Sequence, residues 1–80
     1  MPIVFQDGNI RFHFYSNEGS PRQPIHIHAD RGNAEAKLWL FPDVQIAEST
    51  GFTRREQADL VRIVTARREQ ITRSWHDHFG

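Results

Sequence analysis

Two histidines stand one residue apart in the sequence, at His26 and His28. Because side chains two residues apart in a strand point to the same face, their imidazoles should lie side by side. Two imidazole nitrogens and a nearby carboxylate make a ligand set for a divalent metal ion, and Glu35 is the natural third ligand. Imidazoles also exchange protons near neutral pH, which suits general acid–base catalysis. The pair therefore predicts either a metal site or proton transfer.

The segment before this pair predicts a β-hairpin. Apolar residues at 3–5 and an alternating run at 10–15 flank Asp7 and Gly8. This dipeptide is typical of a type I′ turn, in which both central residues have positive φ. Residues 16–24 are rich in Ser, Asn, Gly and Pro and predict a loop.

The histidine pair itself lies in a second predicted hairpin. Its strands are expected at residues 25–28 and 35–40, with a turn around residues 30–33. Pro42 should end the later strand because proline has no amide proton for the ladder. A fifth, weaker strand is predicted at residues 44–46.

Strand alternation divides the predicted sheet into two faces. Pairing across a six-residue loop would place His28 opposite Glu35 and His26 opposite Lys37. One face is apolar and should form the core: Ile10, Phe12, Phe14, Ile25, Ile27, Ala36, Leu38 and Leu40. The other should be open and polar: Arg11, His13, Tyr15, His26, His28, Glu35, Lys37 and Trp39. The candidate binding residues on this open face are His13, Tyr15, His26, His28 and Trp39.

A C-terminal helix is predicted to cover the apolar face. Thr53 and Glu56 form a capping-box pattern, in which each side chain bonds the backbone amide of the other, so the helix should begin there. Its apolar stripe is Leu60, Val61, Val64, Ile71, Trp75 and Phe79, and its polar side carries Arg55, Arg62, Glu69 and Arg73. The sequence thus predicts an α+β fold: a short antiparallel sheet of four or five strands, followed by one amphipathic helix packed on one face.

Composition narrows the possible functions. The 80 residues are expected to form one domain, residues 1–80. The absence of cysteine excludes disulfides, thiolate metal sites and a cysteine nucleophile. A formal net charge of zero gives no overall basic footprint for nucleic acid. With no basic leader and no long apolar run, neither secretion nor membrane insertion is predicted, and a cytoplasmic location is expected.

Several motifs in order resemble one known family. They are Met1-Pro2-Ile3-Val4, residues 12–19, Pro24-Ile25-His26-Ile27-His28, residues 36–40, Gly51-Phe52 and residues 75–80. The pattern resembles the small bacterial family catalogued as domain of unknown function 4160, and it runs almost end to end. The resemblance implies a tiny prokaryotic protein encoded beside another small protein, an arrangement that implies toxin-antitoxin-like modules. It adds weight to His26 and His28, although Ile25 stands where a second proline is common and His78 where tyrosine is common.

The leading hypothesis is protein–protein binding within such a two-gene module. The binding surface would be the face carrying His, Trp and Tyr, or the arginine side of the helix, and the partner a small protein encoded nearby. Tyr15 and Trp39 could also form a homodimer contact.

Two alternatives remain open. One is an RNA-cleaving toxin in which His26 and His28 transfer protons while Arg11 or Lys37 stabilises phosphate charge. Aromatic and basic groups on a sheet face could hold the RNA. The other is a small module that binds a divalent metal through His26, His28 and Glu35.

Overall fold

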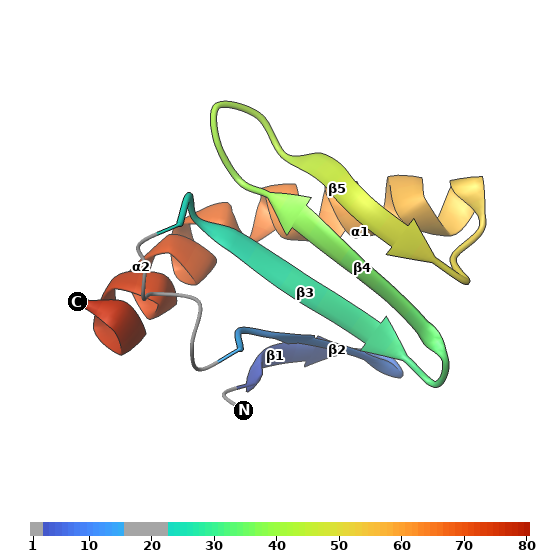
Figure 1. The fold of residues 1–80 in the computed structure, drawn as a ribbon, viewed down its shortest axis with the longest axis horizontal. Coiled ribbons are helices and arrows are strands. Elements are labelled where there is room, and N and C mark those ends of the chain that lie inside the picture. Colours follow the sequence, from blue (N-terminus) through green and yellow to red (C-terminus); the bar gives the residue numbers. More distant parts are fainter. Residues whose placement is uncertain (1–2, 16–22) are drawn as a thin grey trace.

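The computed structural model describes residues 3–15 and 23–80. It contains a five-stranded antiparallel sheet followed by two helices (Figure 1). The elements are β1 (Ile3–Asp7), β2 (Ile10–His13), β3 (His26–Arg31), β4 (Ala34–Trp39), β5 (Gln45–Thr50), α1 (Arg54–Ala66) and α2 (Arg68–Phe79). The strand order is β1-β2-β3-β4-β5, so every strand pairs with its neighbour in the sequence.

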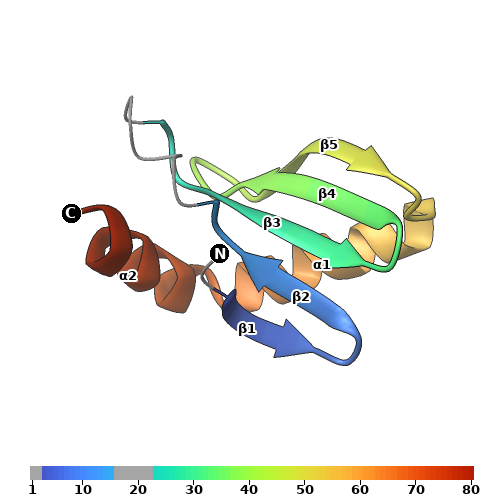
Figure 2. The ribbon, with the colours of Figure 1, turned by 60° about the horizontal axis from the view of Figure 1, so that its bottom comes forward.

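Both helices lie on one face of the sheet (Figure 2), which confirms the predicted α+β fold. The prediction of one continuous helix was wrong, because the helix breaks at Arg67, whose φ of −110° and ψ of 14° leave the helical region. The first residue of α2, Arg68, donates to the backbone oxygens of Leu40 and Pro42 at 3.4 and 3.3 Å. Its guanidinium also lies 5.0 Å from the ring centroid of Phe41. These contacts anchor α2 to the segment that follows β4.

No helix in the described part of the chain is long and apolar enough to cross a bilayer.

The two hairpin turns differ from the predicted ones. Gly8 and Gly32 have φ of 61° and 58°, and no non-glycine residue in the described ranges has positive φ. Positive φ at the first central residue alone is the pattern of a type II′ turn, so the predicted type I′ turn was wrong. The second hairpin closes tightly through Gly32 and Asn33, where a six-residue loop was predicted.

The tight second turn moves the strand register by two residues. His28 pairs with Lys37, and His26 pairs with Trp39. The predicted pairs of His28 with Glu35 and of His26 with Lys37 were therefore wrong. A shift of two residues keeps every side chain on its face, whereas a shift of one would have exchanged the faces.

The remaining strands lie at their predicted places, although β3 extends to Arg31 and β5 to Thr50. The fifth strand is longer than expected, because β5 runs from Gln45 to Thr50. A register irregularity in β4 between Lys37 and Leu38 offsets its pairing with β5. Strand β4 ends three residues before Pro42, which follows a cis peptide bond. Of the loop predicted at residues 16–24, all but the last two residues lie outside the described residues.

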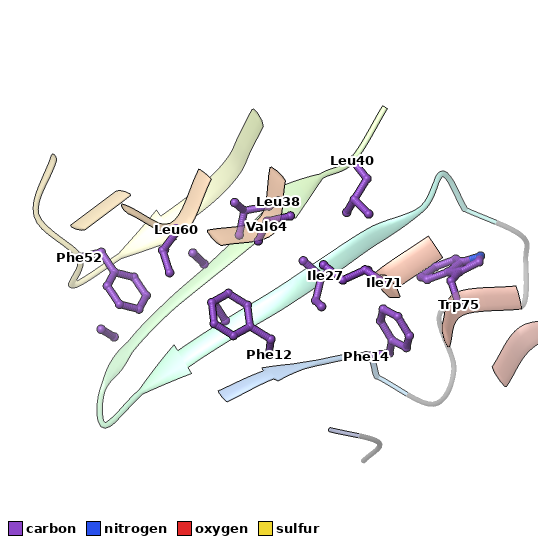
Figure 3. Close-up of a cluster of buried hydrophobic side chains, with 13 residues drawn as sticks. Phe12, Phe14, Ile27, Leu38, Leu40, Phe52, Leu60, Val64, Ile71 and Trp75 are labelled. Carbon is purple, nitrogen blue, oxygen red and sulfur yellow. The ribbon is translucent and has the colours of Figure 1, made fainter. Parts of the chain in front are cut away.

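The core lies between the sheet and the helices (Figure 3). Its large fully buried apolar side chains are Phe12, Phe14, Ile27, Leu38, Leu40, Leu60, Val64 and Ile71. Phe52 and Leu60 lie at one end of this layer and Trp75 and Phe14 at the other (Figure 3). All eight residues of the predicted apolar sheet face lie toward this core, although Ile10 and Ile25 are only partly buried.

The predicted capping box is present at the start of α1. The Glu56 amide donates to the Thr53 hydroxyl at 3.1 Å, and the Thr53 amide donates to the Glu56 carboxylate at 2.8 Å. The same carboxylate lies 2.6 Å from the guanidinium of Arg31 on β3. Glu56 therefore connects the first helical turn to the sheet.

This arrangement makes stability depend on pH. The backbone bond from Thr53, followed by the side-chain bond from Arg31, lowers the pKa of Glu56 below its ordinary value of 4.5. A depressed native pKa stabilises the fold above the unfolded-state pKa, and that contribution is lost as the pH falls through the native value. We expect the gap in unfolding free energy between the wild type and Glu56→Gln to close between neutral pH and the acidic side of 4.5. Urea denaturation of both proteins across this pH range measures the difference in unfolding free energy. A difference that stays constant with pH would contradict the prediction.

Candidate functional site

The face of the sheet turned away from the helices carries a shallow pocket of about 270 Å³. Its lining is His13, Tyr15, His28, Ala29, Asp30, Glu35, Ala36, Lys37, Glu48, Ser49 and Thr50. Two lateral rows of outward side chains border it, one made of His28, Lys37 and Glu48 and the other of Asp30, Glu35 and Thr50. Both rows cross β3, β4 and β5, so the pocket depends on the register of the whole sheet.

At the β2 side of the pocket, Asp30 joins two side chains of the neighbouring strand. One carboxylate oxygen lies 2.6 Å from Nε2 of His13, and the other accepts from Arg11 at 3.0 Å. The antiparallel pairing explains both contacts, because Asp30 stands opposite Arg11 and diagonally opposite His13. This distance is explained by a proton on Nε2 of His13, which faces a buried carboxylate oxygen that has no other partner among the described residues.

The imidazoles of this face pack against one another. The His13 and His28 rings are stacked with centroids 5.7 Å apart, and Tyr15 lies 4.4 Å from His28. The His26 ring is 5.2 Å from His28 and meets it edge-on. A continuous strip of rings therefore crosses β2 and β3 beside the pocket.

Two of these histidines are buried, which corrects the prediction of an open face. His13 is 3% exposed and His26 is fully buried. Trp39 lies 5.5 Å from the His26 ring and Trp75 of α2 lies 5.1 Å from it, while Nδ1 lies 2.8 Å from the Pro24 carbonyl oxygen. Alternation gives the direction of a side chain, whereas its depth depends on the neighbours that pack over it. His28 is the histidine of this strip that remains half-exposed at the pocket.

The predicted metal ligands are not gathered around one point. Glu35 pairs with Asp30 across the strands, His28 with Lys37, and His26 is enclosed by tryptophans. The described residues contain no group of three or more His, Asp or Glu side chains able to hold a metal ion. The register shift removes the juxtaposition on which the metal hypothesis depended.

The two predicted phosphate-binding cations have different surroundings. Arg11 is bonded to Asp30 and is not among the lining residues. Lys37 does line the pocket, and its ammonium lies 4.4 Å from the ring centroid of Trp39. Among the sequence-based candidates for phosphate binding, Lys37 is therefore the one placed beside His28.

Sequence reasoning missed several residues of this site, among them Asp30 and Glu48. Asp30 was assigned to the turn, but it lies within β3 and orients His13. Glu48 was left out because the fifth strand was expected to end at residue 46. The dipeptide Gly32-Asn33 was the signal available, because Gly followed by Asn is a two-residue hairpin sequence that fixes the register.

The arginine side of the helices is partly occupied by internal contacts. The guanidinium of Arg67 lies 4.5 Å from the ring centroid of Phe5, and Arg68 is bonded to the segment that follows β4. Arg62 and Arg73 lie near acidic residues of their own helices, Asp59 at 3.4 Å and Glu69 at 3.6 Å. Arg67 and Arg68 are therefore less available to a ligand, whereas the side chains of Arg62 and Arg73 remain 72% and 71% exposed.

Comparison with known proteins adds one finding. A family model described as Domain of unknown function (DUF4160) matches residues 9–76, a span that includes all of the residues lining the pocket. No curated protein and no solved structure matches the chain.

Proposed function

This chain belongs to the family described as Domain of unknown function (DUF4160), and from that premise we propose that it is the partner-binding component of a two-protein, toxin-antitoxin-like module. The binding surface is the sheet face turned away from the helices. One observation carries the proposal: both helices cover the same face, which leaves the opposite face with a pocket and half-exposed rings of His28 and Trp39.

The composition of this face supports an interface. Tyr15, 42% exposed, and the half-buried Trp39 are of the residue types enriched at interface cores, and carboxylates and a lysine surround the pocket. Such a mixture suits a partner that is folded separately and meets the sheet through an interface with a polar rim. The helix side offers less, because Arg67 and Arg68 pack on aromatic rings of this chain.

The test is co-purification with the product of the neighbouring gene, using matched threonine variants. Thr50→Trp places a bulky neutral side chain at the pocket, and Thr65→Trp places the same side chain on the exposed surface of α1. We expect Thr50→Trp to weaken complex formation at least tenfold and Thr65→Trp to leave it unchanged, as measured by calorimetry. A wild-type protein that stays alone, or equal effects of the two variants, would overturn the proposal.

A second candidate, an RNA-cleaving enzyme, is favoured by one specific observation. His13 is held by Asp30 at 2.6 Å and stacks on His28, which borders the pocket beside Lys37. In this reading His28 transfers the proton and Lys37 stabilises phosphate charge. Incubation with RNA should then give cleavage that His28→Ala abolishes and His76→Ala, at an exposed position of α2, preserves. Intact RNA with the wild-type protein removes this candidate.

A further inference from the structure

Two carboxylates of the pocket have no cationic partner among the described residues. Glu35 and Glu48 stand on either side of Lys37, one on its own strand and one directly across from it. The Lys37 ammonium lies over Trp39, and within residues 3–15 and 23–80 no ion pair involves Glu35 or Glu48. Asp30 is occupied by Arg11 and His13. The pocket therefore has two carboxylates available for an incoming cation.

A buried polar atom points to the same kind of ligand. His13 lines the pocket and is 3% exposed, and its Nδ1 atom has no hydrogen-bond partner in the described part of the chain. When the ring is neutral with its proton on Nε2 toward Asp30, Nδ1 carries a lone pair. Buried polar atoms are nearly always paired, and in the neutral ring this one accepts from a donor. A ligand that brings N–H groups would satisfy it.

The size of the pocket suits one long side chain. Its volume of about 270 Å³ is below the range of about 300–1,000 Å³ that is usual for small-molecule and cofactor sites. A guanidinium group carries five N–H donors, binds carboxylates in a bidentate manner and stacks on aromatic faces. Tyr15 and His28 provide such faces at the rim.

We propose that this pocket binds an arginine side chain presented by the partner protein. Glu35 and Glu48 hold the guanidinium, Tyr15 and His28 stack beside it, and Nδ1 of His13 accepts one of its N–H groups. This inference deepens the proposed partner-binding function and rests on it. It predicts that the partner presents an arginine at its contact surface.

The direct test is a titration of the isotopically labelled protein with a capped Gly-Arg-Gly peptide at low salt, followed by amide chemical shifts. The matched probe is the same peptide with citrulline, which keeps the shape and loses the charge. We expect saturable shifts at Glu35, Glu48 and Thr50 with arginine and none with citrulline. The double variant Glu35→Gln/Glu48→Gln should weaken peptide binding at least tenfold, whereas Glu69→Gln, at a carboxylate on α2 that is 92% exposed, should not.

Other outcomes distinguish the binding of arginine from the proposed partner-binding function. Equal binding of the two peptides, or stronger binding of a lysine peptide, would overturn the guanidinium assignment. Shifts of the same amides with inorganic phosphate or a single-stranded RNA would overturn the cation assignment in favour of an anion. If Thr50→Trp still disrupts the natural complex while the arginine peptide fails to bind, the arginine inference falls and the interface stands. If neither experiment perturbs this face, both proposals fall.

Discussion

Trp75→Ala is expected to remove a large part of the stability of this protein. The indole is 4% exposed, and its ring packs against Phe14 at 5.2 Å, Phe79 at 4.3 Å and His26 at 5.1 Å. Replacing a buried tryptophan by alanine costs about 3–5 kcal/mol, because the cavity closes only in part. A domain of this size has a total stability of about 4–12 kcal/mol. Urea denaturation followed by circular dichroism should show a midpoint at a much lower urea concentration than that of the wild type.

Trp39→Ala is the matched control for this effect. Trp39 is half-buried on the opposite face of the sheet, where water already reaches part of the ring. Its removal should therefore cost clearly less than removal of Trp75. Equal losses at the two positions would contradict the assignment of the helix-covered face as the core.

Gly51→Ala is expected to have the second largest effect. Gly51 links β5 to α1 with φ of 88°, a conformation that costs an L-residue about 1–2 kcal/mol. A Cβ there would also lie 2.9 Å from Cα and 3.0 Å from Cβ of Ala34, and a backbone neighbour cannot move aside cheaply. Adding about 1–3 kcal/mol for the forced shift gives an expected loss of about 2–5 kcal/mol in unfolding free energy.

Gly8→Ala separates the backbone cost of a positive φ from the steric cost of the contact with Ala34. Gly8 also has positive φ, 61°, but no atom lies within 4 Å of the position that an alanine Cβ would take there, so only the backbone cost applies. Thermal and urea unfolding of both variants should rank Gly51→Ala as the more destabilising. The reverse order would mean that the close approach of Ala34 to Gly51 is not a constraint on this fold.

The parts of the fold that follow from local rules were predictable from the sequence. The capping box at Thr53 and Glu56 needs only two residues three positions apart, and it is present as predicted. Alternation placed Phe12 and Leu38 on the buried face, because period two is a property of the extended backbone itself. The two faces of the sheet were predicted correctly although the strand register was wrong, because an error of two residues leaves each side chain on its face.

The helix break could not be read in the same way. The apolar stripe keeps its period from Leu60 through Ile71 to Trp75, so the sequence carries no sign of an interruption between them. Next to the break, Arg68 makes long-range contacts to backbone oxygens 26 and 28 residues away in the chain, which no local pattern records. Tertiary contacts of this kind override local helix preference.

The sequence predicted which histidines lie together in the candidate site, but not how deeply they are buried. The sequence placed His13, His26 and His28 together on one face, and their rings do pack against one another. Burial of His13 and His26 arises from neighbours on other strands and on α2, which no local pattern records. The role of Asp30 was missed for the same reason, because it depends on the pairing of β3 with β2.

The strand order has a consequence for how the chain reaches its native state. Every strand bonds only with its neighbours in sequence, and the turns between β1 and β2 and between β3 and β4 are tight. Closing short loops loses little chain entropy, so hairpins of this kind form within about 1–10 μs. Joining the two hairpins across the longer connection before β3 is the costly step. We therefore expect contacts within the β3–β4 hairpin to form before those between β2 and β3. Mutational folding kinetics would show this as kinetic φ-values near 1 at Ile27 and Leu38, meaning that their native contacts are already formed in the folding transition state.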